Sequence, residues 1–184
     1  MDSIHIGPPE NPGNFMGPLI DKEALKKSEK YIELGRKAAK ELLFSKVNEK
    51  GYFIGASIYT DVSPESPLAQ EEIFGPIVSI MRAKDIDEAL DIANNTMYAL
   101  TGGIFSRSPS NIARTREQLR AGNIYINRQI TGAIVGRQPF GGFGMSGVGS
   151  KAGGPDYLLQ FMNPKSISEN TMRKGFSPLK ENLR

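Results

Sequence analysis

The sequence of 184 residues contains no cysteine, and its one histidine is His5. Without cysteine the chain forms no disulfide and offers no thiolate as a nucleophile or a metal ligand. A single histidine excludes a His-rich metal site and weakens the case for a catalytic triad built on histidine. We expect His5 to be a solvated residue near the terminus, because no second metal-ligating or catalytic partner stands beside it.

The sequence also lacks long apolar runs and a strong excess of charge. No stretch reaches the length of a membrane-spanning helix, and residues 1–5 resemble no signal peptide. Lys and Arg total 23, Asp and Glu total 20, and the two signs are interspersed, which argues against a stripe that binds nucleic acid. The length suits one domain, with or without an appendage. These features predict a cytoplasmic protein without membrane or nucleic-acid partners.

Helical and extended patterns alternate along the chain. Apolar spacing predicts three helices, over residues 22–44, 86–95 and 109–121. Runs rich in β-branched and aromatic residues predict four strands, over residues 52–62, 77–81, 100–105 and 123–127. Asp21, Asp85 and Ser108 suit the N-cap position, and Gly122 suits the C-cap of the third helix. The alternation is typical of an α/β fold with an open, mostly parallel sheet and flanking helices.

The pattern changes after the fourth strand. Residues 128–155 are rich in glycine and have no periodicity, and a long irregular segment inside a compact domain is often functional. An apolar run follows at residues 157–161, and the remaining tail is polar. We expect one strand in that tail, near residues 165–168, and fraying beyond it.

One tempting motif lies in this segment. Residues 142–147 read G-x-G-x-x-G, but a dinucleotide-binding loop needs a strand before it and a helix after it. Neither flank has that pattern, so we interpret the glycines as a tight turn that requires positive φ angles.

Two further segments each allow two interpretations. Residues 71–76 contain the pair Glu71 and Glu72, which could form the first turn of a helix or place a carboxylate against ribose hydroxyls beside an aromatic ring. Residues 128–144 could hold a carboxylate through backbone N–H groups, or could be a buried connection packed on the sheet. Spacing alone does not choose between them.

Together these segments resemble the aldehyde dehydrogenase superfamily, and within it the 1-pyrroline-5-carboxylate dehydrogenases. The resemblance is carried by five segments in the expected order: residues 14–20, 70–76, 131–142, 145–147 and 151–159. It implies oxidation of glutamate γ-semialdehyde to glutamate with NAD. It also implies that this chain corresponds to roughly the last third of such an enzyme, past the nucleophilic cysteine, the general base and the NAD domain.

The resemblance assigns roles to five residues. Glu72 matches the glutamate that binds the nicotinamide ribose, and Phe74 matches the aromatic beside the nicotinamide ring. Gly132 and Ala133 match the loop whose N–H groups hold the substrate carboxylate, although several members have Ser where Ala133 stands. Phe140 matches an aromatic wall of the aldehyde pocket.

The resemblance also divides the chain and suggests partners. Residues 1–161 correspond to part of the catalytic domain, and residues 162–184 to an oligomerisation strand and tail. No catalytic residue and no metal ligand is assigned. We expect the isolated chain to be inactive and to bind NAD weakly or not at all. It would work with a partner chain that carries the missing part, or would instead be a non-catalytic module that forms a homo-oligomer.

Overall fold

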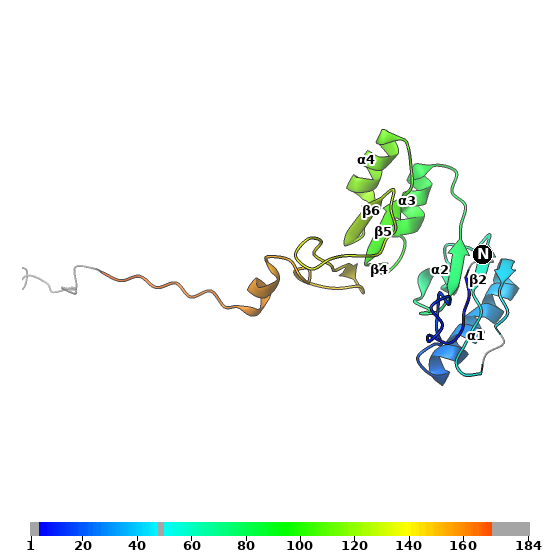
Figure 1. Cartoon of the computed structure of the whole chain (residues 1–184). Helices are drawn as coiled ribbons and strands as arrows, with labels where there is room; N and C mark the ends of the chain where they lie inside the picture. Colours follow the sequence, from blue (N-terminus) through cyan, green and yellow to red (C-terminus); the bar gives the residue numbers. More distant parts are fainter. Residues whose placement is uncertain (1–3, 48–49, 171–184) are drawn as a thin grey trace, which may run out of the picture.

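The computed structural model describes residues 4–47 and 50–170. Two lobes lie side by side, an N-terminal lobe of residues 4–81 and a second lobe of residues 86–127, and an extended segment leads away from the second (Figure 1). Between the lobes, Gln70 Nε2 donates to Asn95 O over 2.7 Å, and Asn95 Nδ2 donates to Glu65 Oε1 over 3.0 Å. These hydrogen bonds tie residues 65–70 of the first lobe to Asn95, which follows the first helix of the second.

Helix α1, Lys22–Ala38, begins where the sequence predicts. The Asp21 carboxylate accepts from Ala24 N over 2.8 Å, which confirms Asp21 as the N-cap. The predicted extension of this helix to residue 44 is wrong, because Lys40–Phe44 form strand β1. β1 pairs with β2, and Leu42, which fitted the helical spacing, is exposed. Pairing with a distant strand therefore overrides the local pattern.

A mixed sheet of three strands lies against α1. β2, Ser57–Thr60, is its central strand, with β1 antiparallel on one side and β3, Ile77–Ile80, parallel on the other. The short helix α2, Pro67–Gln70, lies on the connection from β2 to β3. Tyr59 of β2 has no exposed surface and donates from its hydroxyl to Ile32 O over 3.0 Å. The centre of this lobe is thus a tyrosine that joins sheet to helix.

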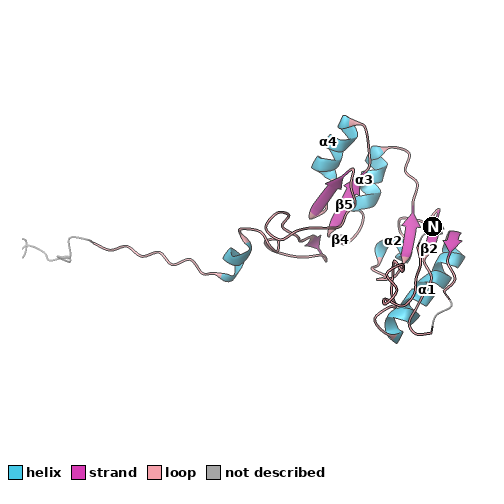
Figure 2. Ribbon diagram, in the orientation of Figure 1, coloured by secondary structure: helices cyan, strands magenta, loops and turns pink. Residues whose placement is uncertain are grey.

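The second lobe combines helices with short strands, and one more strand comes from the segment that follows it (Figure 2). These elements are α3 Ile86–Asn94, β4 Tyr98–Ala99, β5 Thr101–Ile104, α4 Pro109–Gln118, β6 Asn123–Ile126 and β7 Phe143–Gly144. β5 pairs with β6 in parallel, and β4 pairs with β7 antiparallel. Asp85 and Ser108 accept hydrogen bonds at the starts of α3 and α4, as predicted. The α/β class is confirmed.

Gly122 does not cap α4. The helix ends at Gln118 and its C-cap is Leu119. A Cβ on Gly122 would lie 1.8 Å from Gly141 O, so a backbone that crosses close by explains this glycine.

The chain leaves the second lobe through irregular segments and the 3₁₀ helix η1, Tyr157–Phe161, and residues 162–170 then run extended (Figure 1). Within the described chain, residues 165–168 pair with no strand. A strand there requires a partner, so it stays a prediction, and residues 171–184 lie outside the described range. None of the described helices has the length and hydropathy needed to cross a bilayer.

Candidate functional site

A pocket of about 480 Å³ lies where β5 meets the glycine-rich segment. It brings together the three residues that the sequence assigns to a substrate, Gly132, Ala133 and Phe140. The remaining lining residues are mainly small or apolar: Leu100, Thr101, Ile130, Thr131, Val135, Gln138 and Ala152. Such a pocket favours a small, mostly aliphatic ligand fixed by a few polar contacts.

Candidate polar contacts are the backbone N–H groups of Gly132 and Ala133, two residues of the pocket lining. Among the described residues, no group accepts a hydrogen bond from either amide, whereas the next amide, Ile134 N, donates to Gln138 Oε1 over 3.2 Å. Gly132 has a φ of +88°, which a residue with a Cβ rarely adopts. Two adjacent N–H groups without acceptors suit a carboxylate. The alternative of a buried connection is wrong here, since most of residues 128–137 are exposed.

Phe140 is held on both sides through its backbone. It exchanges two hydrogen bonds with Ala152, of 2.9 and 3.0 Å. Asn123, the first residue of β6, donates from Nδ2 to Pro139 O over 3.0 Å and accepts from Gly141 N over 3.2 Å. Four hydrogen bonds therefore fix residues 139–141, and with them the position of the Phe140 ring in the pocket wall.

Close contacts also constrain the residues around these four hydrogen bonds. Gly122 leaves room for Gly141 O, as described above, and Lys151 Nζ donates to Gly122 O. Sequence reasoning missed Asn123 and Lys151. The only available signal was an amide side chain at the start of an otherwise apolar strand.

The second candidate segment, residues 71–75, lies on α1 in the N-terminal lobe. Lys27 Nζ donates to Glu72 O, and the Tyr31 hydroxyl donates to Glu71 Oε2. A Cβ on Gly75 would lie 2.6 Å from Ser28 Oγ, so this glycine permits the close approach. The segment follows α2, with Glu71 as its C-cap. The interpretation as the first turn of a helix is therefore wrong.

The hydrogen bond to Glu71 raises the pKa of Tyr31 to about 12, with a further contribution from burial. The neutral hydroxyl is the donor that the Glu71 carboxylate needs. Tyr31 thus links the buried face of α1 to the residue before Glu72, a contact between positions 40 apart that no local pattern indicates.

Glu72 and Phe74 both project from this segment. Phe74 has a φ of +61° and its side chain is 81% exposed, and the Glu72 carboxylate, also exposed, forms no hydrogen bond or ion pair with any described residue. A left-handed aromatic residue on the surface is unusual, and such backbone often marks a functional position. The structure keeps this pair in the N-terminal lobe, apart from the lining of the pocket.

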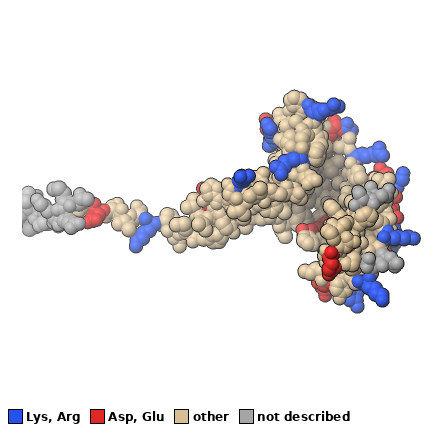
Figure 3. All heavy atoms as spheres, viewed as in Figure 1, with Lys and Arg blue, Asp and Glu red and all other residues tan. Residues whose placement is uncertain are grey.

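Two remaining predictions concern the turn at residues 142–147 and the exposure of His5. Gly144 and Gly147 have φ angles of +59° and +153°, and no helix directly follows them, so the chain turns after β7 within residues 142–147, as predicted. His5 is exposed. The part of the chain that the structure describes has no cluster of side chains able to hold a metal ion, and the visible face in Figure 3 mixes both charge signs over both lobes.

Comparison with known proteins defines the class. The model of the aldehyde dehydrogenase family matches residues 1–167, and the chain belongs to this family. Its relatives include two proteins named 1-pyrroline-5-carboxylate dehydrogenase, from Geobacillus sp. strain WCH70 and Bacillus subtilis strain 168. Each is 50% identical, over 90% and 91% of this chain but only 32% and 33% of the relative. The chain thus spans about a third of their length.

Solved structures agree with this assignment. Proline utilization A from Bdellovibrio bacteriovorus, inactivated by N-propargylglycine, is 55% identical with a TM-score of 0.90, over 97% of this chain and 19% of that one. The 1-pyrroline-5-carboxylate dehydrogenase from Thermus with bound NAD is 43% identical with a TM-score of 0.82, over 87% and 31%. The α/β fold and the family predicted from the sequence are both confirmed.

Proposed function

We propose that this chain provides the aldehyde-binding part of a 1-pyrroline-5-carboxylate dehydrogenase, which oxidises glutamate γ-semialdehyde to glutamate with NAD. The supporting observation is the pocket that joins Gly132, Ala133 and Phe140, with two backbone amides that have no acceptor in the described chain. The amides would hold the substrate carboxylate, and the Phe140 ring would flank its aliphatic chain.

The division of the reaction follows from the residue inventory. In the family a thiolate attacks the aldehyde, hydride passes to NAD, and water hydrolyses the thioester. The 184 residues contain no cysteine, so a polypeptide of this sequence alone has no group for the first step. A partner would supply the nucleophile, the general base and most of the NAD site, while this chain would add Glu72 at the ribose and Phe74 at the nicotinamide.

The test is NADH formation from glutamate γ-semialdehyde at high protein concentration. We expect no turnover from this chain alone, since loss of a nucleophile costs many orders of magnitude in rate. The chain is then mixed with the part of the Geobacillus relative that precedes the matched region. Activity that depends on both components supports the proposal, and clear turnover by the chain alone contradicts it.

Calorimetry with NAD adds a second measurement on the isolated chain. Glu72 and Phe74 are two contacts of a much larger site, so we expect weak or undetectable binding. Micromolar affinity would contradict the expected incompleteness of this site.

A second candidate function is a self-associating module without catalysis. It is favoured by the apolar side chains exposed at and after η1: Leu158, Leu159, Phe161, Met162 and Ile167, each between 61% and 79% exposed. Apolar surface of this extent usually needs a cover, and a second copy supplies one by symmetry. Residues 162–184 would then contribute the pairing strand.

Light scattering separates the two candidates. A stable oligomer formed by the chain alone favours the module, whereas aggregation that a complementing fragment relieves favours the enzyme part. A well-behaved monomer in both conditions contradicts the module.

A further inference from the structure

We propose that Arg128 is a binding residue for an anionic ligand at the Gly132 end of the pocket, and that it selects aldehydes that carry a carboxylate. This inference rests on the proposed function, since the pocket must hold a substrate for the selection to act.

The two amides at Gly132 and Ala133 can orient a carboxylate through hydrogen bonds, but they carry no formal charge. Transfer of a carboxylate out of water has a large desolvation free energy, and neutral N–H donors offset less of it than a cation does. The residues that line the pocket include no Lys or Arg. A positive charge must therefore come from the rim if the pocket is to favour anions over neutral ligands of the same shape.

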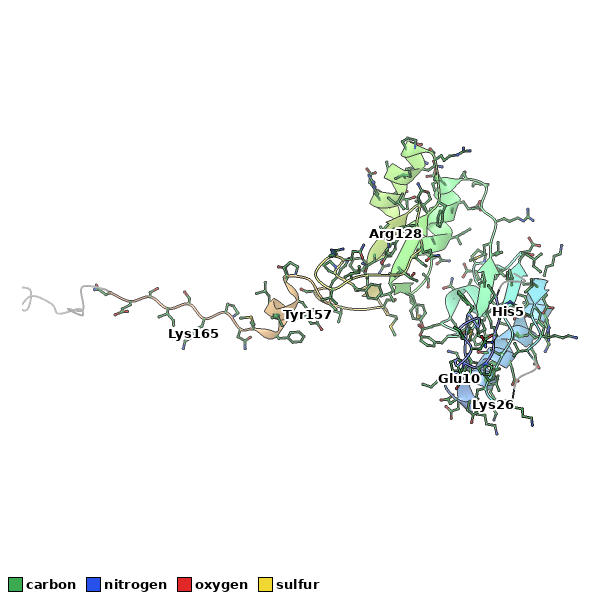
Figure 4. All side chains as sticks on the ribbon, in the orientation of Figure 1. His5, Glu10, Lys26, Arg128, Tyr157 and Lys165 are labelled. Atoms are coloured by element: carbon green, nitrogen blue, oxygen red, sulfur yellow. The ribbon has the colours of Figure 1, made fainter. Side chains whose placement is uncertain are left out.

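Arg128 lies at that rim. Apart from Gly132 itself and its neighbours Thr131 and Ala133, the described residues place one heavy atom within 4 Å of the point where Gly132 would carry a Cβ, and it is Nη2 of Arg128 at 3.9 Å. The space on the Cβ side of Gly132 is therefore open except for the guanidinium. Figure 4 shows Arg128 on the second lobe, away from the labelled His5, Glu10 and Lys26 of the N-terminal lobe.

Two contacts hold Arg128 in place. Its guanidinium lies over the ring of the buried Tyr125, with Cζ 5.4 Å from the ring centroid. The preceding residue, Asn127, has a φ of +53° and clamps Ser106, accepting from its N over 2.8 Å and donating to its O over 3.0 Å. The turn after β6 therefore fixes the backbone that carries Arg128, and the Tyr125 ring supports its guanidinium near the Gly132 loop.

The charge of Arg128 is also available. The three ion pairs in the described residues join other residues, namely Arg36 with Glu41, Arg82 with Asp61, and Arg114 with Asp87. No described carboxylate neutralises Arg128. A planar guanidinium beside two amides can bind one carboxylate through both of its oxygens.

The test uses the whole chain labelled with ¹⁵N, and glutamate as the probe. Amide shifts of Gly132 and Ala133 are followed in wild type, Arg128→Met, Arg128→Lys and the control Arg137→Met. Arg137 is an exposed arginine of the same segment that is absent from the pocket lining. The α-amide of glutamate, which lacks the α-carboxylate, is titrated in parallel.

We expect Arg128→Met to raise the Kd for glutamate about tenfold, the usual effect of a charge-assisted hydrogen bond. Arg128→Lys should recover part of the lost affinity, and Arg137→Met should change the Kd for glutamate less than twofold. The α-amide should bind wild type and Arg128→Met with the same Kd. Unchanged glutamate binding by Arg128→Met overturns the inference alone. Equal losses in both Met variants, or equal losses for both ligands, also overturn it. No shift of either amide in wild type contradicts the proposed pocket as well.

Discussion

The two segments with candidate functional residues are held in different ways. Residues 71–75 lie on α1, within a lobe that contains both clusters of buried apolar side chains found in the described chain, one around Tyr59 and one around Ile32. The pocket segment instead depends on hydrogen bonds from Asn123 and Ala152 and on close backbone approach at Gly122. Ile73 packs against the Tyr59 cluster, so core packing adds to the hydrogen bonds from Lys27 and Tyr31 in positioning the first segment. The second segment is positioned mainly by hydrogen bonds and glycines.

This contrast has a physical consequence. Side chains buried in a cluster lose much free energy when truncated, and the loss spreads through the lobe. Hydrogen bonds to an irregular segment contribute less each, but they decide where its backbone lies. We therefore expect variants in the N-terminal lobe to change global stability, and variants around the pocket to change ligand binding first.

The largest effect is expected for Tyr59→Ala. Tyr59 is fully buried, and its ring lies against Gly35, so truncation should lower the free energy of unfolding by about 3–5 kcal/mol. Urea denaturation followed by circular dichroism measures the loss. Leu42→Ala, at an exposed position of β1, is the control and should change stability by less than about 0.5 kcal/mol. Similar losses in both would contradict the packing difference within the lobe.

Next is Asn123→Leu, which leaves Pro139 O and Gly141 N without their partners. Burial of unpaired groups costs about 1–3 kcal/mol, and residues 139–141 should shift. Amide spectra of Phe140 and its neighbours should change while those of α1 do not. Asn123→Asp keeps the acceptor for Gly141 N and loses the donor to Pro139 O, so its effect should be smaller. Changes that spread equally into the N-terminal lobe would refute local control of the pocket.

A smaller effect, with a defined pH dependence, is expected for Tyr31→Phe. Loss of a hydrogen bond to the exposed Glu71 should cost about 1 kcal/mol at neutral pH. The pKa of Tyr31 is raised from 10.0 to about 12 in the folded state. Its contribution is therefore present below pH 10 and is lost as pH rises toward 12.

Stability measured between pH 9 and pH 12 checks the sign of this effect. Wild type should lose more stability than Tyr31→Phe over the upper part of that range, and absorbance titration should show one late-titrating tyrosine fewer in the variant. Parallel stability curves would argue against the Tyr31–Glu71 contact.

Local features of the fold could be predicted from the sequence because they depend on neighbouring residues. Asp21, Asp85 and Ser108 cap helices as expected, because an N-cap requires only a side-chain acceptor and the amides two or three residues later. The turn at residues 142–147 follows from its glycines in the same way.

Features that depend on distant residues could not be predicted. Lys40–Phe44 form a strand because β2 lies beside them, although their spacing continues a helical pattern. Gly122 suited a C-cap by a local rule, yet Gly141 determines its role. The pocket residues came from a family resemblance, whereas Asn123, Tyr31 and Arg128 became visible only when segments far apart in sequence were brought together.

The smallest effects compare one hydroxyl in each lobe. Tyr59→Phe removes a 3.0 Å hydrogen bond to Ile32 O and should cost about 1 kcal/mol. The Tyr125 hydroxyl is buried with no hydrogen-bond partner among the described residues. Tyr125→Phe therefore removes a hydroxyl whose desolvation no hydrogen bond offsets, and it should be neutral or slightly stabilising. The Phe ring keeps its face under Arg128, so glutamate binding should also persist. If denaturation shows a cost above 1 kcal/mol for Tyr125→Phe, its hydroxyl has a partner and the second lobe is held by buried polar pairing in the same way as the first.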